Sequence, residues 1–512
     1  MLPPDALTAT PRPSIRRNVI ANYAGQGVAS LTSLLLVPVY IGYLGIEAWA
    51  LVGLFAVIQA WMAMLDMGMA PTLGRETARF SAGTRPAQSV RDLLRSLEVV
   101  YLGLAIGVAV ALTLFADVVA RQWLRADALP VATVAGALSM LGIVVAMRFC
   151  EGLYRSGIMG LQQQVWLGGV SVALTLLRSF GALAVLALVS PTVQAFFVWQ
   201  GLVSLLTLVV LGARLHRALP PGRAQFSMQA LKSISGFAGG IFATTLLTLL
   251  MGQFDKLLLS RLVPLADLGV YMLASTIAGG LWLVGGPVVL AVAPAFVARL
   301  EAGESAGLAA VYHRAARLVT IVLAPAALLM MVFPYGLLFA WSGDAVLAAR
   351  AAPILALLAA GTFFNALYQV PHHLQTAAGW TGLTLRLSLV AVVAMVPAML
   401  WAVPAHGPVG AAAVWAAVNL LFVGVGVPLQ HRRLLPGGLW RWWRSDVLVP
   451  FGLAAAVMAM GWVLRPAPGA GRWEWLAFCL VAGGLSFAAA ALSATGGRRD
   501  RSKSHDSGVT GP

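Results

Sequence analysis

The sequence predicts an all-α, polytopic membrane protein with about fourteen transmembrane helices, and three observations carry this prediction. Apolar windows of about 20 residues follow one another along almost the whole chain, and roughly 20 helical residues cross a hydrocarbon core. Lys and Arg fall on alternate sides of these windows. The chain is 60% hydrophobic and only 10% charged, whereas soluble domains contain roughly 25% charged residues.

Each predicted span is an apolar window long enough to cross the bilayer as a helix. The windows lie at residues 19–40, 46–69, 97–116, 130–150, 166–189, 195–213, 235–259, 268–294, 316–340, 346–370, 384–403, 409–429, 447–464 and 474–493. Because their number is even, both termini are expected on the same side of the membrane.

The distribution of basic residues predicts which side that is. Cytoplasmic loops carry an excess of Lys and Arg. With the N-terminus inside, 26 of the 34 basic residues fall in inner segments and Arg178 falls within a span. The outer set is Arg121, Arg125, Lys256, Arg261, Arg350, Arg465 and Arg472. We therefore expect a multi-pass protein with both termini in the cytoplasm, in contact with membrane lipids; the family resemblance described below implies that the membrane is the bacterial inner membrane.

Charge and cysteine content exclude several other classes. The net charge of +16 is spread over short inner segments and forms no continuous basic face, so we expect no nucleic-acid partner. Cys150 and Cys479 lie at or inside predicted helices and lack metal-ligand spacing. His372 and His373 are adjacent without a third ligand, and we interpret them as loop residues. We expect no metal and no cofactor other than a coupling ion, H⁺ or Na⁺.

The predicted organisation is two six-helix bundles around a central cavity, followed by two more helices. The segments are a cytoplasmic N-terminal segment (1–17), an N-terminal bundle (18–215), a cytoplasmic linker (216–234), a C-terminal bundle (235–430), a cytoplasmic loop (431–446), helices thirteen and fourteen (447–493) and a disordered cytoplasmic tail (494–512).

A weak internal repeat supports the two bundles. Residues 43–51 (YLGIEAWAL) hold the same place as 262–271 (LVPLADLGVY), and 78–83 (ARFSAG) the same place as 298–303 (ARLEAG). The offset of about 220 residues coincides with six predicted spans. An even number of spans per unit indicates a parallel repeat, as in the halves of alternating-access transporters.

Several stretches resemble one family. They are Arg17-Asn18, Asn22, Gly25-Gln26-Gly27, residues 36–40 (LVPVY), 43–51 and 65–71 (LDMGMAP), Arg75-Glu76, and, in the second half, residues 253–259 (QFDKLLL). These stretches are similar to polysaccharide flippases, the Wzx-type O-antigen and exopolysaccharide translocases of the multidrug/oligosaccharidyl-lipid/polysaccharide exporter superfamily. The resemblance covers the first 110 residues or so well and residues 230–305 moderately.

The resemblance implies a function and partners. It implies a flippase that moves an undecaprenyl-diphosphate-linked oligosaccharide from the cytoplasmic to the periplasmic leaflet by alternating access, for surface polysaccharide biosynthesis. A polysaccharide polymerase and glycosyltransferases are expected as partners, and the flippase itself is not expected to be an enzyme.

Arg178 is a candidate substrate-binding residue, because an ionisable group inside a span is costly and marks function by default. Facing a wet cavity, its guanidinium could bind a diphosphate bidentately. The alternative is an ion pair with a carboxylate, or hydrogen bonds to carbonyls, of a neighbouring helix.

Two acids are candidates for ion coupling. Asp255 could bind a proton or Na⁺, or instead form an ion pair with Lys256 or Arg261. Asp66, next to Gly68 and Pro71, could serve as a second coupling site; capping the break made by those residues is the favoured interpretation.

Polar stripes are candidate cavity linings. Asn22 and Gln26 recur at four-residue spacing, as do Asn365 and Gln369, so each pair shares a helix face. They could accept sugar hydroxyls, or form the hydrogen bonds between helices for which membrane proteins use the same residue types.

Two further sets are gate or hinge candidates. Arg148 and Glu151 are three residues apart and are expected to pair at the inner end of the fourth helix. Gly285, Gly286 and Pro287 are expected to interrupt the eighth helix as a hinge.

Two other functions compete with the flippase. A cation-coupled antiporter that exports small drugs would need an acidic, aromatic cavity, which Arg178 does not suit. A membrane polysaccharide polymerase or glycosyltransferase would need catalytic carboxylates on a long outer loop, and the predicted outer loops are short.

Overall fold

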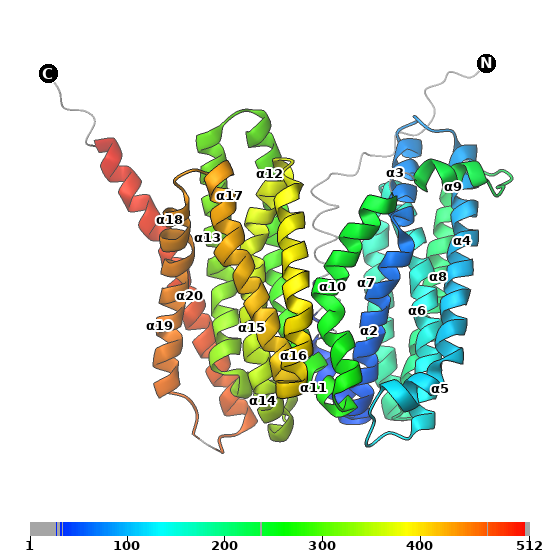
Figure 1. The fold of residues 1–512 in the computed structure, drawn as a ribbon, viewed down its shortest axis with the longest axis horizontal. Helices are drawn as coiled ribbons and strands as arrows, with labels where there is room; N and C mark the ends of the chain where they lie inside the picture. The colour runs from blue at the N-terminus through cyan, green and yellow to red at the C-terminus, as the bar shows by residue number, and fades with distance from the viewer. Residues whose placement is uncertain (1–26, 28–30, 33, 236–237, 468, 507–512) are drawn as a thin grey trace. The chain divides into compact units, whose positions relative to one another are not determined.

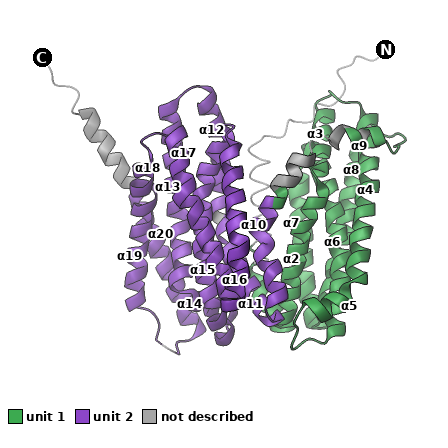
Figure 2. Ribbon diagram, in the orientation of Figure 1, with its two compact units in different colours: residues 1–246 green, residues 247–512 purple. Residues whose placement is uncertain are grey.

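The protein is predominantly helical in the part of the chain that the structure describes (Figure 1). This computed structural model describes residues 27, 31–32, 34–235, 238–467 and 469–506. The chain divides into two compact units, residues 1–246 and 247–512, and α10 (Ala238–Leu262) runs across the division (Figure 2). Each unit is a helical bundle.

In the described part of the first unit, a short apolar helix at Leu34–Leu44 precedes the longer ones. Its further helices are α2 (Ile46–Asp66), α3 (Met69–Ser81), α4 (Ala87–Leu114), α5 (Ala116–Val118), the π-helical η2 (Val119–Trp123), α6 (Val131–Gly160), α7 (Gln164–Leu188), α8 (Val193–Ala218) and α9 (Met228–Ser235). Helix α6 is central to this unit, because it packs against α2, α3, α4 and α8.

The second unit is organised around α13 and α15, which pack against each other and against α12. Its helices are α11 (Leu265–Gly279), α12 (Leu281–Glu301), α13 (Ser305–Val332), α14 (Pro334–Ser342), α15 (Ala345–Ala377), α16 (Thr381–Leu421), η3 (Phe422–Gly426), α17 (Val427–Leu434), α18 (Leu439–Arg441), η4 (Trp442–Leu448), α19 (Val449–Val463) and α20 (Arg472–Asp506). Helices α19 and α20 pair with each other and with α13.

Eleven helices among the described residues are long and apolar enough to cross a membrane. One of them, residues 381–434, is 54 residues long, which at about 1.5 Å per residue is far more than one crossing requires. The backbone of Gly407 is not helical (φ 55°, ψ −139°), and the chain reverses there to make a hairpin of two spans (Figure 1). The first predicted span, 19–40, lies largely outside the described residues, so the total of fourteen stays a prediction.

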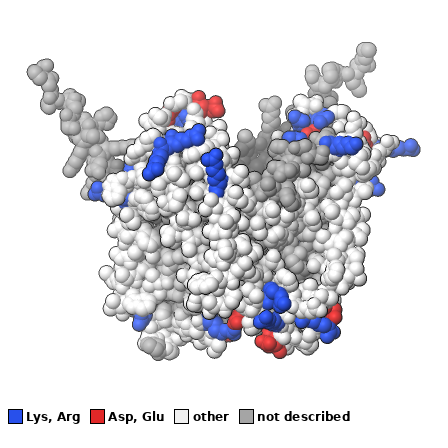
Figure 3. Space-filling model, viewed as in Figure 1, with Lys and Arg blue, Asp and Glu red and all other residues white. Residues whose placement is uncertain are grey.

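The outer faces of the helices suit contact with lipid. On α4, Leu102, Ile106 and Val110 follow one another at four-residue spacing and are about half exposed. On the face shown in Figure 3, charged side chains of each unit lie toward the two ends of its helices, with a broad band of uncharged residues between them. The chain is therefore a multi-pass membrane protein, as its composition predicts.

The repeat reappears in the order of the helices. Helices α2 and α11 begin at Ile46 and Leu265, 219 residues apart, and α3 and α12 end at Ser81 and Glu301, 220 residues apart. Helices α4 and α13 follow in the same places. Each unit therefore contains a broken helix pair followed by a long helix.

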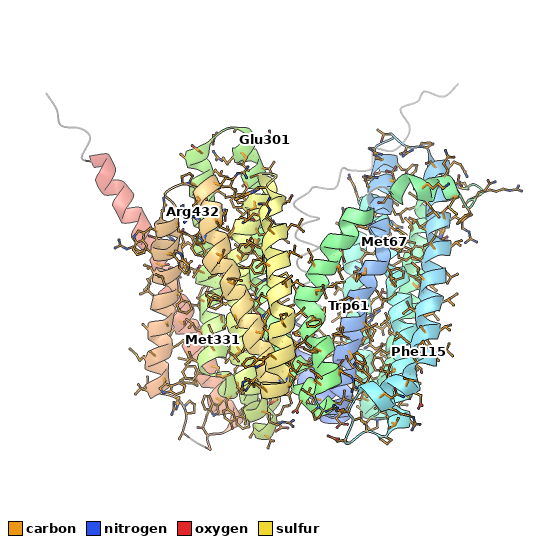
Figure 4. All side chains as sticks on the ribbon, in the orientation of Figure 1. Trp61, Met67, Phe115, Glu301, Met331 and Arg432 are labelled. Carbon is orange, nitrogen blue, oxygen red and sulfur yellow. The ribbon has the colours of Figure 1, made fainter. Side chains whose placement is uncertain are left out.

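The break between α2 and α3 is built by its local sequence. Met67 and Gly68 both adopt left-handed backbone (φ 46° and 80°), which glycine tolerates and a side chain resists. Figure 4 labels Met67 at this point. The Asp66 carboxylate accepts a hydrogen bond from the Ala70 amide at 2.9 Å. The predicted capping role of Asp66 is thus confirmed, and its carboxylate also accepts a hydrogen bond from the Tyr101 hydroxyl.

Two local predictions are wrong. The backbone is helical through Gly285–Pro287, and the helix ends instead at Gly279, before α12. Gly285 serves close packing, because a Cβ there would lie 2.8 Å from Leu323 Cδ1 of α13. His372 and His373 lie inside α15 rather than in a loop, since its last turns extend past the apolar window.

Arg148 and Glu151 are expected at the inner end of the fourth span. Both lie inside α6, which continues ten residues beyond the predicted end of that span. A helix does not stop where its apolar window stops, because its backbone hydrogen bonds are indifferent to the polarity of the side chains.

Candidate functional site

A cluster of three arginines and one glutamate lies within the first unit. Arg148, Glu151 and Arg155 are three and four residues apart on α6, so they share one face of that helix. Arg178 comes from the middle of α7. The charges of all three arginines act on the Glu151 carboxylate, whose residue is 8% exposed. We call these four residues the arginine cluster.

Arg178 pairs with Glu151. Its Nη2 lies 3.5 Å from Glu151 Oε1 and donates a hydrogen bond to Thr207 Oγ1 of α8 at 3.4 Å. The Arg178 side chain is 16% exposed. This is the arrangement that the sequence offered as the alternative to a diphosphate site, a carboxylate partner on a neighbouring helix.

Arg148 does not pair with Glu151, so that prediction is wrong. Its Nη1 and Nη2 donate to the side-chain oxygens of Gln59 on α2, at 3.0 Å, and Gln200 on α8, at 3.3 Å. Its guanidinium also lies 4.7 Å from the centre of the Phe55 ring. Neutral partners hold the Arg148 charge in place without cancelling it.

Arg155 completes the excess of positive charge. Its Nη1 donates to Ser171 Oγ of α7 at 2.9 Å, again a neutral partner. The cluster therefore holds three cations against one carboxylate. Two buried polar atoms in it, Arg148 Nε and Glu151 Oε1, have no hydrogen-bond partner among the described residues, although Oε1 lies 3.5 Å from Arg178 Nη2. Buried polar atoms without a hydrogen bond are costly.

An arrangement of this kind can attract an anion. Guanidinium groups match phosphate and diphosphate oxygens bidentately. In a protein interior their charge is much less screened than in water. Four helices, α2, α6, α7 and α8, supply the side chains of the cluster and its neutral partners, so its geometry depends on the packing of the whole unit.

The second unit holds the predicted coupling residue Asp255, which is 4% exposed. Its carboxylate accepts a hydrogen bond from the Tyr271 hydroxyl at 2.5 Å and pairs with Lys256 Nζ at 3.1 Å. The alternative of an ion pair with Lys256 is therefore present. The Lys256 ammonium therefore balances the charge of the Asp255 carboxylate.

Asn365 and Gln369 lie on one face of α15, as their spacing predicts. Asn365 Nδ2 donates to Asn419 Oδ1 of α16 at 2.7 Å, and Gln369 Nε2 donates to Asn365 Oδ1 at 3.4 Å. The contact with Asn419 is the hydrogen bond between helices that was the alternative to a cavity lining, whereas the contact between Gln369 and Asn365 lies within α15. Asn22 and Gln26 lie outside the described residues.

A second buried ionic cluster in this unit was missed by the sequence analysis. Asp446 of η4 is fully buried and is hydrogen-bonded to His313 Nδ1 of α13, and Arg317 Nη2 lies 3.3 Å from its Oδ1. The carboxylate is 133 residues from His313. No sequence spacing could have joined them, although a carboxylate beside the Trp-rich stretch before α19 was a visible signal.

Comparison with known proteins identifies the family. A family model described as polysaccharide biosynthesis protein matches residues 51–344, more than half of the chain. The chain belongs to this family. The matched range includes the whole arginine cluster and Asp255. A search of curated proteins finds no match.

Several solved structures share the fold of this protein. A lipid II flippase MurJ in an inward closed conformation aligns with a TM-score of 0.69 at 10% identity, covering 94% of this chain and 99% of the other. An inward-facing multidrug resistance MATE transporter of the MOP superfamily aligns at 0.59 and 16% identity, covering 81% and 94%. A MOP superfamily transporter from Pyrococcus furiosus aligns at 0.52 and 14% identity, covering 82% and 96%. At these identities the likeness shows the fold.

Proposed function

We propose that this protein flips an undecaprenyl-diphosphate-linked oligosaccharide from the cytoplasmic to the periplasmic leaflet of a bacterial inner membrane, for surface polysaccharide biosynthesis. The observation that carries the proposal is the arginine cluster, three cations against one carboxylate within a membrane-spanning bundle. The family concerns polysaccharide biosynthesis, and the MurJ fold match is titled a lipid II flippase.

The chemistry of the substrate fits the cluster. A diphosphate linked to a polyprenyl chain and a sugar brings negative charge into a membrane and needs cations along its path. Arg178 is held by a weak contact of 3.5 Å to Glu151, which is longer than a strong charge-assisted bond of about 2.8 Å. A diphosphate oxygen could therefore replace Glu151 as its partner without breaking an optimal pair.

Transport in this proposal needs no covalent step by the protein. The polyprenyl-linked sugar enters from the side of the membrane where the arginines are most numerous, which we propose is the cytoplasm. Glycosyltransferases would supply it and a polysaccharide polymerase would use it on the other side. A gradient of H⁺ or Na⁺, acting on Asp255, would make the process directional.

The MATE fold matches keep drug export as a second candidate. A cationic drug would meet an excess of arginines in the first unit, which disfavours it there. The acidic residue that could serve such a substrate, Asp255, is already paired with Lys256.

The test replaces Arg178 in a strain whose surface polysaccharide depends on this protein. Arg178→Ala should reduce export about a hundredfold at normal protein level, because a desolvated charge-assisted contact with diphosphate contributes about 1.5–3 kcal/mol. Arg178→Lys should recover part of the loss, since Lys lacks the bidentate fork. Full export by the Ala variant would reduce Arg178 to a packing residue.

A matched control uses a charge that the cluster does not contain. Arg441 of α18 is exposed, and Arg441→Ala should leave export unchanged. Efflux of a cationic dye by the same cells separates the two candidates: accumulation of dye together with normal polysaccharide in the Arg178→Ala variant would favour drug export.

A further inference from the structure

A second basic site lies at one end of the first unit, on another face of α6 from the arginine cluster. It is a pocket of about 990 Å³ between α4, α6, α8 and the segment 219–224. Cys150 and Leu153 of α6 line it, and these point away from the face that carries Arg148, Glu151 and Arg155. The chain that follows the segment 219–224 is bound to α4, because Asp92 and Ser96 of α4 accept hydrogen bonds from the Gln225 and Ser227 amides at 2.9 and 2.8 Å.

Arg91 is the unusual group of this pocket. The residue is only 9% exposed, yet its side chain makes no hydrogen bond or ion pair with any residue that the structure describes. Its guanidinium rests against Gly222, where an added Cβ would lie 1.8 Å from Nη1. A nine-tenths buried cation that has no protein partner and lines a pocket points to an anionic ligand.

The rim of the pocket adds positive charge. Arg95 and His216 line it, together with one acid, Glu98. Glu98 is already engaged: it accepts hydrogen bonds from the Tyr154 hydroxyl at 2.9 Å and from His216 Nε2 at 2.8 Å, and it pairs with Arg95 at 3.7 Å. Arg91 therefore has no carboxylate partner among the described residues that line the pocket.

The same face of α4 becomes apolar beyond Glu98. Leu102 and Ile106 also line the pocket and are 58% and 54% exposed. Arg91, Arg95, Glu98, Leu102 and Ile106 are spaced so that they form one stripe along the helix. This stripe runs from a buried cation to a surface that faces hydrocarbon, over about 22 Å at 1.5 Å per residue.

We propose that this pocket binds an anionic glycerophospholipid of the surrounding leaflet, independently of the flipped substrate. Its phosphate contacts Arg91 and Arg95, and one acyl chain lies along Leu102 and Ile106. A soluble phosphate would satisfy the guanidinium but would leave the apolar stripe without a role, so the charge and the stripe together favour a lipid. The bound lipid fastens α4 to the segment 219–224, which leads from α8 toward α9.

The experiment measures thermal unfolding of the full-length protein in a zwitterionic detergent during titration with three probes. These are dioleoyl phosphatidylglycerol, dioleoyl phosphatidylcholine and glycerol 3-phosphate. Phosphatidylglycerol should raise the midpoint at about tenfold lower concentration than phosphatidylcholine, as for one charge-assisted contact. Glycerol 3-phosphate, which lacks acyl chains, should have no effect in the same range. Equal protection by glycerol 3-phosphate would overturn the lipid.

Variants locate the site. Arg91→Gln should move the phosphatidylglycerol curve to about tenfold higher concentration and leave the phosphatidylcholine curve in place. Arg95→Gln should weaken it in the same direction, and because the Arg95 side chain is 56% exposed this variant keeps the test valid if Arg91→Gln folds poorly. Arg441→Gln, the same charge change in the second unit, should move neither curve. An unchanged response in both pocket variants would overturn the site.

Discussion

The polar interiors of the two units differ in how their charges are balanced. In the first unit, three arginines share one carboxylate and rely on Gln59, Gln200, Ser171 and Thr207 for their remaining contacts. In the second unit, Asp255 has Lys256 and Tyr271, and Asp446 has His313 and Arg317. Both units contain the same pattern of a broken helix pair and a long helix, so the shared fold does not impose the charge balance.

The difference separates charge used for structure from charge available to a ligand. A buried carboxylate with a cation beside it has its partner within the protein. A buried cation held by neutral amides and hydroxyls is positioned but keeps its charge, and an anion can still be attracted to it. The first unit is therefore the better candidate for contact with a diphosphate.

The largest expected effect comes from Asp446 in the second unit. Asp446→Ala should lower the free energy of unfolding by about 3–5 kcal/mol, because it removes a fully buried carboxylate that pairs with Arg317 and is hydrogen-bonded to the buried His313. Thermal unfolding of the purified protein measures this. A loss of under about 1 kcal/mol would mean that the charges there are not mutually balanced.

The next effect concerns the lone carboxylate of the first unit. Glu151→Gln should increase the affinity for pyrophosphate about tenfold, since it removes the internal competitor of the anion while keeping the shape of the side chain. Protection against thermal unfolding by pyrophosphate provides the measurement, and Asp446→Asn is the comparison in the other unit. If the Glu151 variant responded to pyrophosphate like the wild type, the excess positive charge would not be available to a ligand.

A smaller effect on stability is expected at Asp255, about 1 kcal/mol, because Asp255→Asn keeps the hydrogen bond with Tyr271 but weakens the contact with Lys256. Its functional effect should be distinct: flipping in vesicles should no longer respond to a collapsed proton or sodium gradient. Tyr271→Phe removes the hydrogen bond and retains the carboxylate, so it should keep the response. Wild-type flipping that ignores both gradients would remove the coupling role from Asp255.

The smallest effect is expected at Asn365, whose contacts are neutral. Asn365→Ala should cost about 0.6 kcal/mol, the average for a hydrogen bond between membrane helices, and should leave export unchanged. A strong loss of export at normal stability would instead place Asn365 in a sugar-binding surface.

Sequence reasoning recovered the parts of this molecule that depend on neighbours along the chain. Apolar length placed most spans, because the hydrocarbon thickness sets how many residues a crossing needs. The offset between 43–51 and 262–271 anticipated the matching starts of α2 and α11. The break at Asp66 followed from Gly68 and Pro71, since capping and left-handed backbone are local properties.

The partners of the buried charges were decided by the tertiary structure alone. Arg148 and Glu151 have the spacing of a pair but do not bind each other. Arg148 instead binds Gln59 of α2 and Gln200 of α8, and Glu151 pairs with Arg178 of α7. Asp446 meets His313 across 133 residues. Helical spacing specifies which residues share a face, whereas the packing of helices distant in sequence specifies what that face meets. For ionisable groups inside a membrane, the contacts made by this packing determine whether a charge is neutralised within the protein or remains available to a ligand.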